Sequence, residues 1–192
     1  MIKRYPIALG LALAAVAMPG ALAAPSPAAQ SWTVDQGGSS LEFIGVAEGE
    51  EFNGAFGNWS AQINFDPEHL DWSAVEVTID LTSADTGDSS RDGPLQNNDW
   101  FWTAMYPNAS FKTQSITAAG DGSYVAQATL TIRDHTEEVT LPFKLAIDGD
   151  KAAMTGTLVL DRTAFGIGNS SYLDKNVDPQ VAVDVALTAT RG

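Results

Sequence analysis

Apolar residues alternate with polar ones, at every second position, in five separate segments of the 192-residue chain. Successive side chains of a β-strand point to opposite faces, so each alternating segment predicts a strand with one buried and one solvated face. A parallel sheet covered on both faces would instead need nearly continuous apolar strands. The alternating segments are residues 59–65, 75–81, 139–147, 154–160 and 181–187.

Short Gly- and Asp-rich segments separate the predicted strands. Residues 35–38, 119–122 and 148–150 have the composition of hairpin turns, and residues 66–69 close a further strand. Many strands joined by short turns predict an all-β domain, either an antiparallel sandwich or a barrel. A closed sheet of eight strands can hold one small apolar ligand, so binding is the default functional hypothesis.

Residues 83–107 depart from the alternating pattern. Asp88 or Ser89 is placed to cap a short helix running towards Asn98, which Gly93 and Pro94 would make irregular. Four aromatic residues follow within seven positions, and we expect this cluster to cover the core. They are Trp100, Phe101, Trp102 and Tyr106.

The first 23 residues have the order of a secretory signal peptide. Lys3 and Arg4 precede an apolar run over residues 7–18, and small residues follow at positions 21–23. The apolar run is shorter than the ~20 residues of a membrane-spanning helix. We therefore expect cleavage after Ala23, a linker over residues 24–30, one domain over residues 31–192, and a periplasmic location.

The charge of the chain narrows its partners. It carries 10 basic and 24 acidic residues, a net charge of −14, which becomes −16 once the signal peptide is removed. Such an acidic surface repels nucleic acid and anionic lipid headgroups, so neither is expected as a partner. The chain has no Cys, which leaves no disulfide framework and no thiolate chemistry.

The sequence shows no catalytic constellation, so we expect no enzymatic activity. The two His residues, His69 and His135, lie in different turns, which argues against a metal site. Capping and turn formation are the favoured roles for four neighbouring acidic residues, over calcium binding or glycoside chemistry. These residues are Asp85, Asp88, Asp92 and Asp99.

Short motifs also follow one another along residues 31–191. They are Asn53-Gly54-Ala55-Phe56, Phe65-Asp66-Pro67, Thr86-Gly87, Arg91-Asp92, Asp99-Trp100-Phe101, Tyr106-Pro107, Leu130-Thr131-Ile132-Arg133, Val139-Thr140-Leu141-Pro142-Phe143, Leu160-Asp161-Arg162 and Phe165-Gly166-Ile167-Gly168. In this order they resemble the YceI-like family of periplasmic polyisoprenoid-binding proteins. The resemblance implies an extended antiparallel eight-stranded lipocalin-like barrel with a short helical segment packed beside it.

The same resemblance implies one long apolar ligand threaded through the barrel, an isoprenoid lipid or quinone, with no other cofactor. Arg91, Asp92 and Arg162 are expected as headgroup contacts or structural anchors. The residues expected to contact the ligand are Phe43, Phe56, Ile63, Val77, Ile79, Trp100, Phe101, Trp102, Leu130, Ile132, Leu145, Leu158 and Val183.

Two departures from the family pattern matter. Residues 43–48 lack the His that many members carry there, and Asp134 stands where the family usually has Gly. The His-free pattern resembles a subgroup associated with a membrane b-type cytochrome, which suggests a quinone ligand and a cytochrome partner.

Several alternatives to an isoprenoid carrier stay open at this stage. The barrel could hold a fatty acid or fatty amide instead. It could be an enzyme acting on a lipid or glycan through Arg91, Asp92 and Asp99. It could also have a filled core and a surface partner, because filled and hollow barrels both need inward apolar residues. A homodimer stays open as an assembly.

Overall fold

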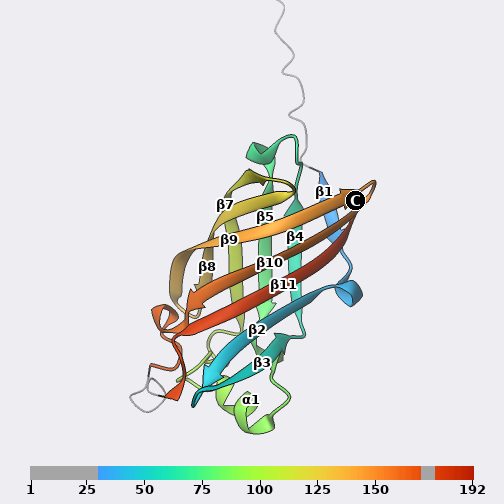
Figure 1. The fold of residues 1–192 in the computed structure, drawn as a ribbon. Helices are drawn as coiled ribbons and strands as arrows, with labels where there is room; N and C mark the ends of the chain where they lie inside the picture. Colours follow the sequence, from blue (N-terminus) through green and yellow to red (C-terminus); the bar gives the residue numbers. More distant parts are fainter. Residues whose placement is uncertain (1–29, 170–175) are drawn as a thin grey trace, which may run out of the picture.

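The computed structural model describes residues 30–169 and 176–192, so the predicted signal peptide and most of the linker lie outside the described residues. The described chain is mostly antiparallel strand (Figure 1). The strands are β1 (Ser31–Val34), β2 (Ser40–Ala47), β3 (Glu50–Phe56), β4 (Trp59–Asn64), β5 (Ala74–Asp80), β6 (Ala84–Asp85), β7 (Asn108–Gly120), β8 (Ser123–Ile132), β9 (His135–Asp148), β10 (Lys151–Asp161) and β11 (Gln180–Arg191).

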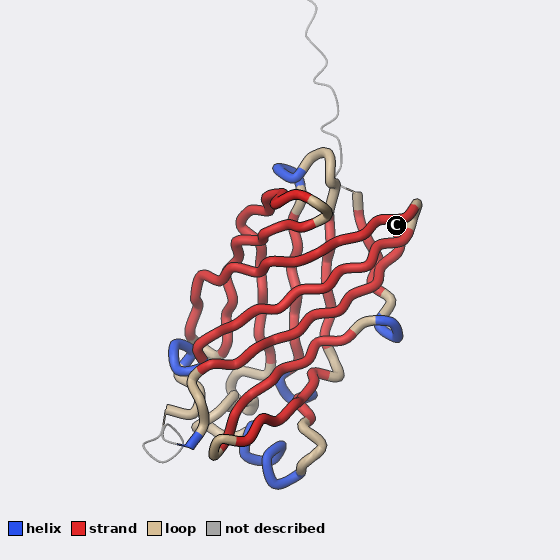
Figure 2. Tube along the Cα trace, in the orientation of Figure 1, coloured by secondary structure: helices blue, strands red, loops and turns tan. Residues whose placement is uncertain are grey.

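Eight of these strands form a closed ring, which confirms the predicted barrel. The order is β1, β4, β5, β7, β8, β9, β10 and β11, and β11 pairs back to β1 (Figure 2). Strands β2, β3 and β6 continue the sheet from β11 at one end of the ring. Within the described residues every pairing between these strands is antiparallel, as the alternating pattern predicted.

The prediction of a hairpin turn at residues 35–38 was wrong. Strands β1 and β2 do not pair with each other; both pair with β11, at Trp32↔Arg191 and at Phe43↔Val183. Between them lies the 3-10 helix η1 (Gln36–Gly38), whose first turn is capped by the Asp35 carboxylate. A Gly- and Asp-rich segment also suits a local offset of the chain, so its composition does not by itself show that the chain reverses.

Two other turns were predicted correctly, and one was missed. Asp121-Gly122 joins β7 to β8, with φ of 51° and 72°, and Gly149-Asp150 joins β9 to β10. The missed hairpin turn, Glu48-Gly49, joins β2 to β3 with φ of 55° and 82°. In Asp121-Gly122 and Glu48-Gly49, two successive residues at positive φ match the twist of the paired strands, which explains why Gly occupies one position of each of these two turns.

The segment without alternation holds the α-helix α1 (Ser89–Leu95), which the Asp88 side chain caps through the Ser90 backbone N–H. Its last residue, Leu95, is buried beside Phe43 and Ala84, so the helix packs against one end of the barrel. No described helix has the length and hydropathy needed to cross a bilayer. The remaining 3-10 helices are η2 (Leu70–Trp72), η3 (Leu81–Ser83) and η4 (Arg162–Phe165).

Inward side chains of the barrel are not all packed tightly. Leu141 and Phe143 of β9 are buried, at 7% and 9% exposure. Val75, Val77 and Ile79 of β5 face the same interior and yet keep partial accessibility. Side chains enclosed by a barrel retain accessible surface only when space is left beside them, so the interior is incompletely filled.

Two glycines in the β2–β3 hairpin each lie opposite a phenylalanine of the neighbouring strand. Gly54 pairs with Phe43, and Gly45 pairs with Phe52. A Cβ on Gly45 would stand 2.7 Å from the Phe52 ring, and a Cβ on Gly54 would overlap the Phe43 ring. Each ring therefore lies over the glycine opposite it, in space that any larger residue would occupy.

Gly54→Ala is expected to destabilise the fold by ~1–3 kcal/mol, because the Phe43 ring must move to admit the methyl group. Gly93→Ala is the matched control: it adds the same methyl group in helix α1, where no atom lies within 4 Å. That change should stabilise by about 0.5–1 kcal/mol through helix propensity. Urea denaturation of both variants is the measurement, and wild-type stability for Gly54→Ala would contradict this account.

Candidate functional site

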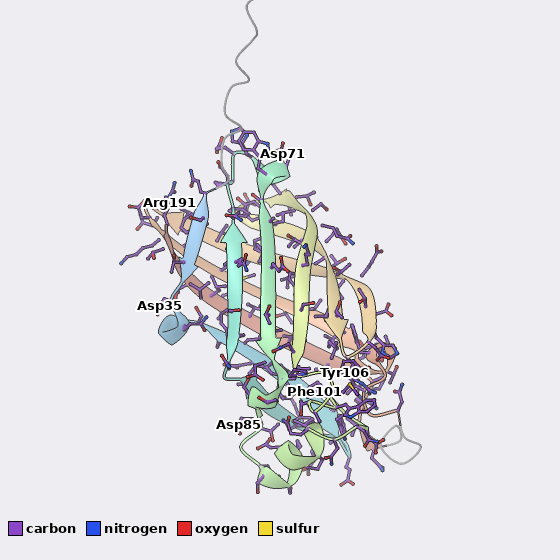
Figure 3. All side chains as sticks on the ribbon, turned by 180° about the vertical axis from the view of Figure 1, so that it is seen from behind. Asp35, Asp71, Asp85, Phe101, Tyr106 and Arg191 are labelled. Carbon is purple, nitrogen blue, oxygen red and sulfur yellow. The ribbon has the colours of Figure 1, made fainter. Side chains whose placement is uncertain are left out.

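The barrel encloses two cavities that lie one after the other along its axis. The large chamber, about 200 Å³, occupies the end near α1, and the small chamber, about 90 Å³, occupies the other end. Figure 3 shows Phe101 and Tyr106 at the α1 end and Asp71 at the opposite end. Among the described residues that line the two chambers, Arg162 alone carries a charge. The interior is therefore an apolar compartment inside a closed sheet.

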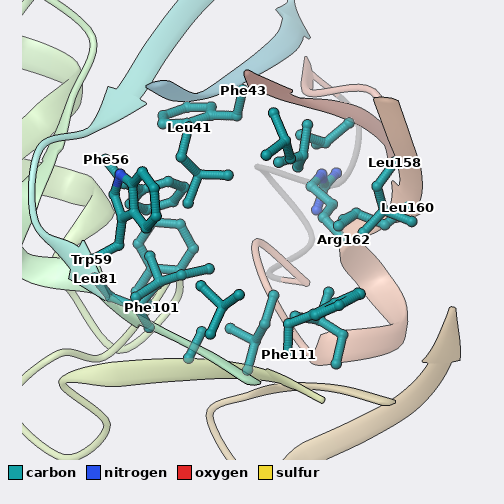
Figure 4. Close-up of a pocket in the computed structure, with 18 of the residues that line it drawn as sticks. Leu41, Phe43, Phe56, Trp59, Leu81, Phe101, Phe111, Leu158, Leu160 and Arg162 are labelled. Carbon is teal, nitrogen blue, oxygen red and sulfur yellow. The ribbon is translucent and has the colours of Figure 1, made fainter. Parts of the chain in front are cut away.

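The large chamber is walled by aromatic and aliphatic side chains from opposite sides of the barrel (Figure 4). Phe56 packs between Phe43 and Phe101, with ring centroids 5.1 Å and 6.1 Å away. Leu158 and Leu160 of β10 face this aromatic group across the chamber, beside Arg162. These walls can enclose a hydrocarbon chain and offer it little polar contact.

The structure brings together most of the residues that the sequence predicted for ligand binding. Ile63 and Leu145 line the small chamber. The predicted ligand-binding residues that line the large chamber are Phe43, Phe56, Val77, Ile79, Trp100, Phe101, Leu130, Ile132, Leu158 and Val183. Whether any of these side chains contacts a ligand stays a prediction, since lining a chamber shows only where a side chain lies.

Trp102 does not line either chamber, which corrects its predicted position. Its φ of 50° turns the chain, and its side chain is 36% exposed against Tyr106. Arg133 stacks over the Trp102 ring at 5.6 Å and donates hydrogen bonds to the carbonyls of Trp100 and Gly166. Arg133 itself has φ of 59°, in the two-residue turn with Asp134. The turn thus holds the aromatic loop in place.

Some lining residues come from outside the alternating strands, where sequence reasoning did not place them. Leu95 belongs to α1, and Ile167 and Val177 flank the segment outside the described residues. Leu95 was the one apolar residue of the predicted helix besides Pro94, and this pattern could have identified it. The other two follow from the tertiary fold and carry no local pattern.

Arg162 is an anchor of the chain around the chamber. It is 2% exposed, and its Nη1 donates to the carbonyls of Ile167 and Gly168 at 2.7 and 3.0 Å. Its Nη2 and Nε donate to the carbonyls of Val177 and Asp178 at 2.6 and 3.0 Å. One guanidinium thus joins two segments that lie on either side of the residues outside the described part.

Arg91 and Asp92 stand outside the chambers. Arg91 stacks over Phe52 at 4.4 Å and lies 3.8 Å from the Asp88 carboxylate. The Asp92 carboxylate accepts hydrogen bonds from the Thr86 backbone N–H and hydroxyl at 2.8 and 2.7 Å. These contacts fix the loop between β6 and α1; whether Arg91 or Asp92 also contacts a ligand headgroup stays a prediction.

Three aspartates each accept the same pair of local hydrogen bonds. Hydrogen bonds from the hydroxyl and backbone N–H of the residue two positions on lower the pKa of Asp80, Asp88 and Asp161 below its ordinary value. Because the folded-state pKa is lowered, each bond stabilises the fold at neutral pH and is lost as the pH falls through that pKa. The partners are Thr82, Ser90 and Thr163.

The residues considered for metal binding lie apart. His69 stacks on Trp72 with ring centroids 3.9 Å apart, and His135 lies 2.9 Å from the Asp134 carboxylate. The Asp85 carboxylate accepts from the Gly87 N–H. Over residues 30–169 and 176–192, no group of three or more His, Asp or Glu side chains is arranged to hold a metal ion.

Ala126 and Ala128 of β8 test the chambers directly. Both are inward-facing and almost fully buried, at 2% and 1% exposure, but Ala126 lines the small chamber and Ala128 lines neither chamber. Ala126→Leu should therefore change stability by less than ~1 kcal/mol, whereas Ala128→Leu should overpack and destabilise by ~1–3 kcal/mol. Thermal and urea unfolding measure both; equal destabilisation would show that the interior is filled at Ala126.

Arg162→Met should destabilise by more than ~3 kcal/mol. The change removes the donors to four carbonyls, and each buried carbonyl left without a partner lowers the free energy of unfolding by ~1–3 kcal/mol. Arg91→Met is the control with the same side-chain replacement at a partly exposed position, and it should lie within ~1 kcal/mol of wild type. Near-equal unfolding midpoints for the two variants would rule out the anchor role of Arg162.

Comparison with known proteins places the chain in a family. BcnA of Burkholderia cenocepacia, a crystal structure, is 32% identical with a TM-score of 0.78, over 82% of this chain and 99% of that one. A polyisoprenoid-binding domain from Saccharophagus degradans has a TM-score of 0.67 at 18% identity, over 85% and 99% of the two chains, which shows the fold alone.

Curated relatives agree with the structures. A UPF0312 protein of Vibrio parahaemolyticus is 29% identical over 184 residues, which cover 90% of this chain and 94% of that protein. The protein YceI of Escherichia coli is 36% identical over 97 residues, half of each chain. The family model of the YceI-like domain matches residues 32–189, the whole barrel from β1 to β11. The chain therefore belongs to the YceI-like family.

Proposed function

We propose that this protein binds the tail of one long-chain isoprenoid lipid, a polyprenoid or an isoprenoid quinone, and carries it through the periplasm. The observation that supports this most directly is the pair of apolar chambers inside a closed barrel. Their axis runs along the barrel, so a ligand that fills both must be long and narrow. An apolar tail of that shape matches the lining along its whole length.

The binding free energy would come from the tail. Each buried CH₂ group contributes ~0.8 kcal/mol, so a tail of many carbons binds well without a polar contact. The sheet closes on itself where β1 pairs with both β4 and β11, and β2 and β3 extend the wall beside the large chamber. The barrel thus separates an apolar tail from water while its outer face stays polar.

The lining favours a neutral tail over a buried carboxylate. Arg162 is the charged residue among the described side chains that line the chambers, and its guanidinium already donates to four backbone carbonyls. A fatty-acid carboxylate inside the chambers would need a cationic partner, and burying it without one is unfavourable. An isoprenoid therefore fits better than a fatty acid held with its carboxylate inside.

Binding is also favoured over catalysis by the surroundings of the polar residues. Arg91 and Asp92 lie outside the chambers, and the Asp92 carboxylate is engaged by Thr86. The Saccharophagus degradans domain is described as polyisoprenoid-binding, which agrees in kind with the proposal. Export, a cytochrome partner and a homodimer stay predictions from the sequence and the family resemblance.

Native mass spectrometry of the protein purified from a periplasmic extract tests the proposal. We expect an intact mass that begins at Ala24 plus one bound lipid per chain, and organic extraction should release a polyprenoid or quinone. Leu158→Asp places a carboxylate on the inward face of β10. Val159→Asp is its control, because it places the same carboxylate at an exposed position on the outward face of the strand. Loss of lipid in folded Leu158→Asp but not in Val159→Asp supports the interior site; a lipid-free wild type that also binds no added prenol would contradict it.

A further inference from the structure

Five side chains of the described residues line both chambers and therefore stand at their boundary. Each comes from a different strand of the ring, so together they surround the axis between the chambers. We call this ring the waist. Its members are Val75 of β5, Phe111 of β7, Leu141 of β9, Met154 of β10 and Leu187 of β11.

The waist is fixed by the strand ladder on most of its circumference. Met154 is paired with Leu187 on one side and with Leu145 on the other. The Thr113 hydroxyl accepts from the Val75 backbone N–H at 2.8 Å, which holds β5 at this level. The positions of the waist residues therefore cannot shift without breaking the barrel, and only their side chains can move.

The side chains at the waist differ in how freely they can move. Phe111 and Leu141 are buried, at 9% and 7% exposure, whereas Met154 keeps partial accessibility. Methionine is unbranched and adapts its shape more readily than the other apolar residues. On the β8 side, Ala126 lies opposite Leu141 and lines the small chamber. A narrow chain could pass there once Met154 changes rotamer.

The far end of the small chamber is backed by aromatic rings. Tyr124 packs against Phe65 and Phe143, with ring centroids 5.5 and 5.4 Å away. Trp32, 5% exposed, donates its Nε1 hydrogen to the Phe65 carbonyl at 2.9 Å. These side chains define where a tail that has crossed the waist would end.

We propose that the waist sorts ligands by tail length: a short tail fills the large chamber alone, and only a longer tail passes Met154 into the small chamber. This inference rests on the proposed function and adds to it a preference for tails long enough to reach both chambers. Each CH₂ that enters apolar surroundings raises affinity about fourfold. Affinity should therefore rise again for tails that cross the waist, and level off once the small chamber is full.

A series of prenols, from farnesol through geranylgeraniol to solanesol, tests this through displacement of a fluorescent apolar probe from the delipidated protein. Two variants obstruct the path: Ala126→Leu narrows the small chamber, and Met154→Trp blocks the waist. The matched control is Ala61→Leu, which makes the same substitution as Ala126→Leu at a residue that lines only the large chamber.

We expect Ala126→Leu to bind farnesol within about twofold of wild type, because Ala126 does not line the large chamber, whereas Met154→Trp is compared with wild type only in how its affinity depends on tail length. In both variants the gain in affinity from farnesol to solanesol should be at least about tenfold smaller than in the wild type. A tenfold loss of affinity corresponds to the burial of fewer than two CH₂ groups. Ala61→Leu should weaken all prenols by a similar factor. If Met154→Trp does not fold, Ala126→Leu decides, and Ala126→Val repeats the test with a smaller side chain.

Folded Ala126→Leu with the wild-type dependence on tail length would overturn the sorting role of the waist, and the proposed function would stand because prenols still bind. A wild-type protein that binds no prenol of any length would instead overturn the proposed function. The two failures are therefore distinct.

Discussion

The hollow interior depends on the pairing of one four-residue strand. Strand β1 pairs with β11 at Trp32↔Arg191 and with β4 at Trp32↔Ile63, and these pairings turn a sheet into a ring. Trp32 reinforces the closure, because its indole donates to the Phe65 carbonyl and Arg191 stacks over its ring at 5.1 Å. Without this seam Ile63 and Asn64 of β4 would lose their strand partners, and the small chamber would open to water.

The volume inside the ring follows from which inward residues are large and where they stand. Phe43 and Phe52 each lie over the glycine opposite them, so their rings occupy space that the glycine leaves free. Ala126 and Ala128 have small side chains, so the inward face of β8 takes up little volume beside the waist. The remaining space is enclosed by apolar atoms, and an apolar cavity of this kind favours hydrocarbon over water. The chambers thus arise from side-chain volume within a regular ladder.

The fold was largely predictable from sequence because strand periodicity is local. The alternation of Val75, Val77 and Ile79 predicted both the strand and its inward face, and Asp121-Gly122 predicted the hairpin turn that joins β7 to β8. The segment at residues 35–38 was misinterpreted because the same composition fits a 3-10 helix capped by Asp35. Whether a chain reverses there depends on β11, which is far away in the sequence.

The chambers were harder to predict than the strands. An inward alanine such as Ala126 or Ala128 has the same pattern whether it faces a cavity or a neighbour, so hollow and filled barrels look alike in sequence. The role of Arg162 was left open for a related reason, since its carbonyl partners Val177 and Asp178 are distant in the chain. Trp102 was expected to contact the ligand together with Trp100 and Phe101, and it is 36% exposed and lines neither chamber.

Two methionines report separately on ligand binding in the interior and at the surface in a single experiment. In a chain that begins at Ala24 the methionines are Met105, which is 58% exposed, and Met154, which lines both chambers. The measurement is the NMR spectrum of the ¹³C-labelled methionine methyl groups during titration of the delipidated protein with solanesol. The account predicts that the Met154 signal shifts and that the Met105 signal stays in place. A shift of Met105 with Met154 unchanged would show that the lipid binds the surface, and it would contradict the account.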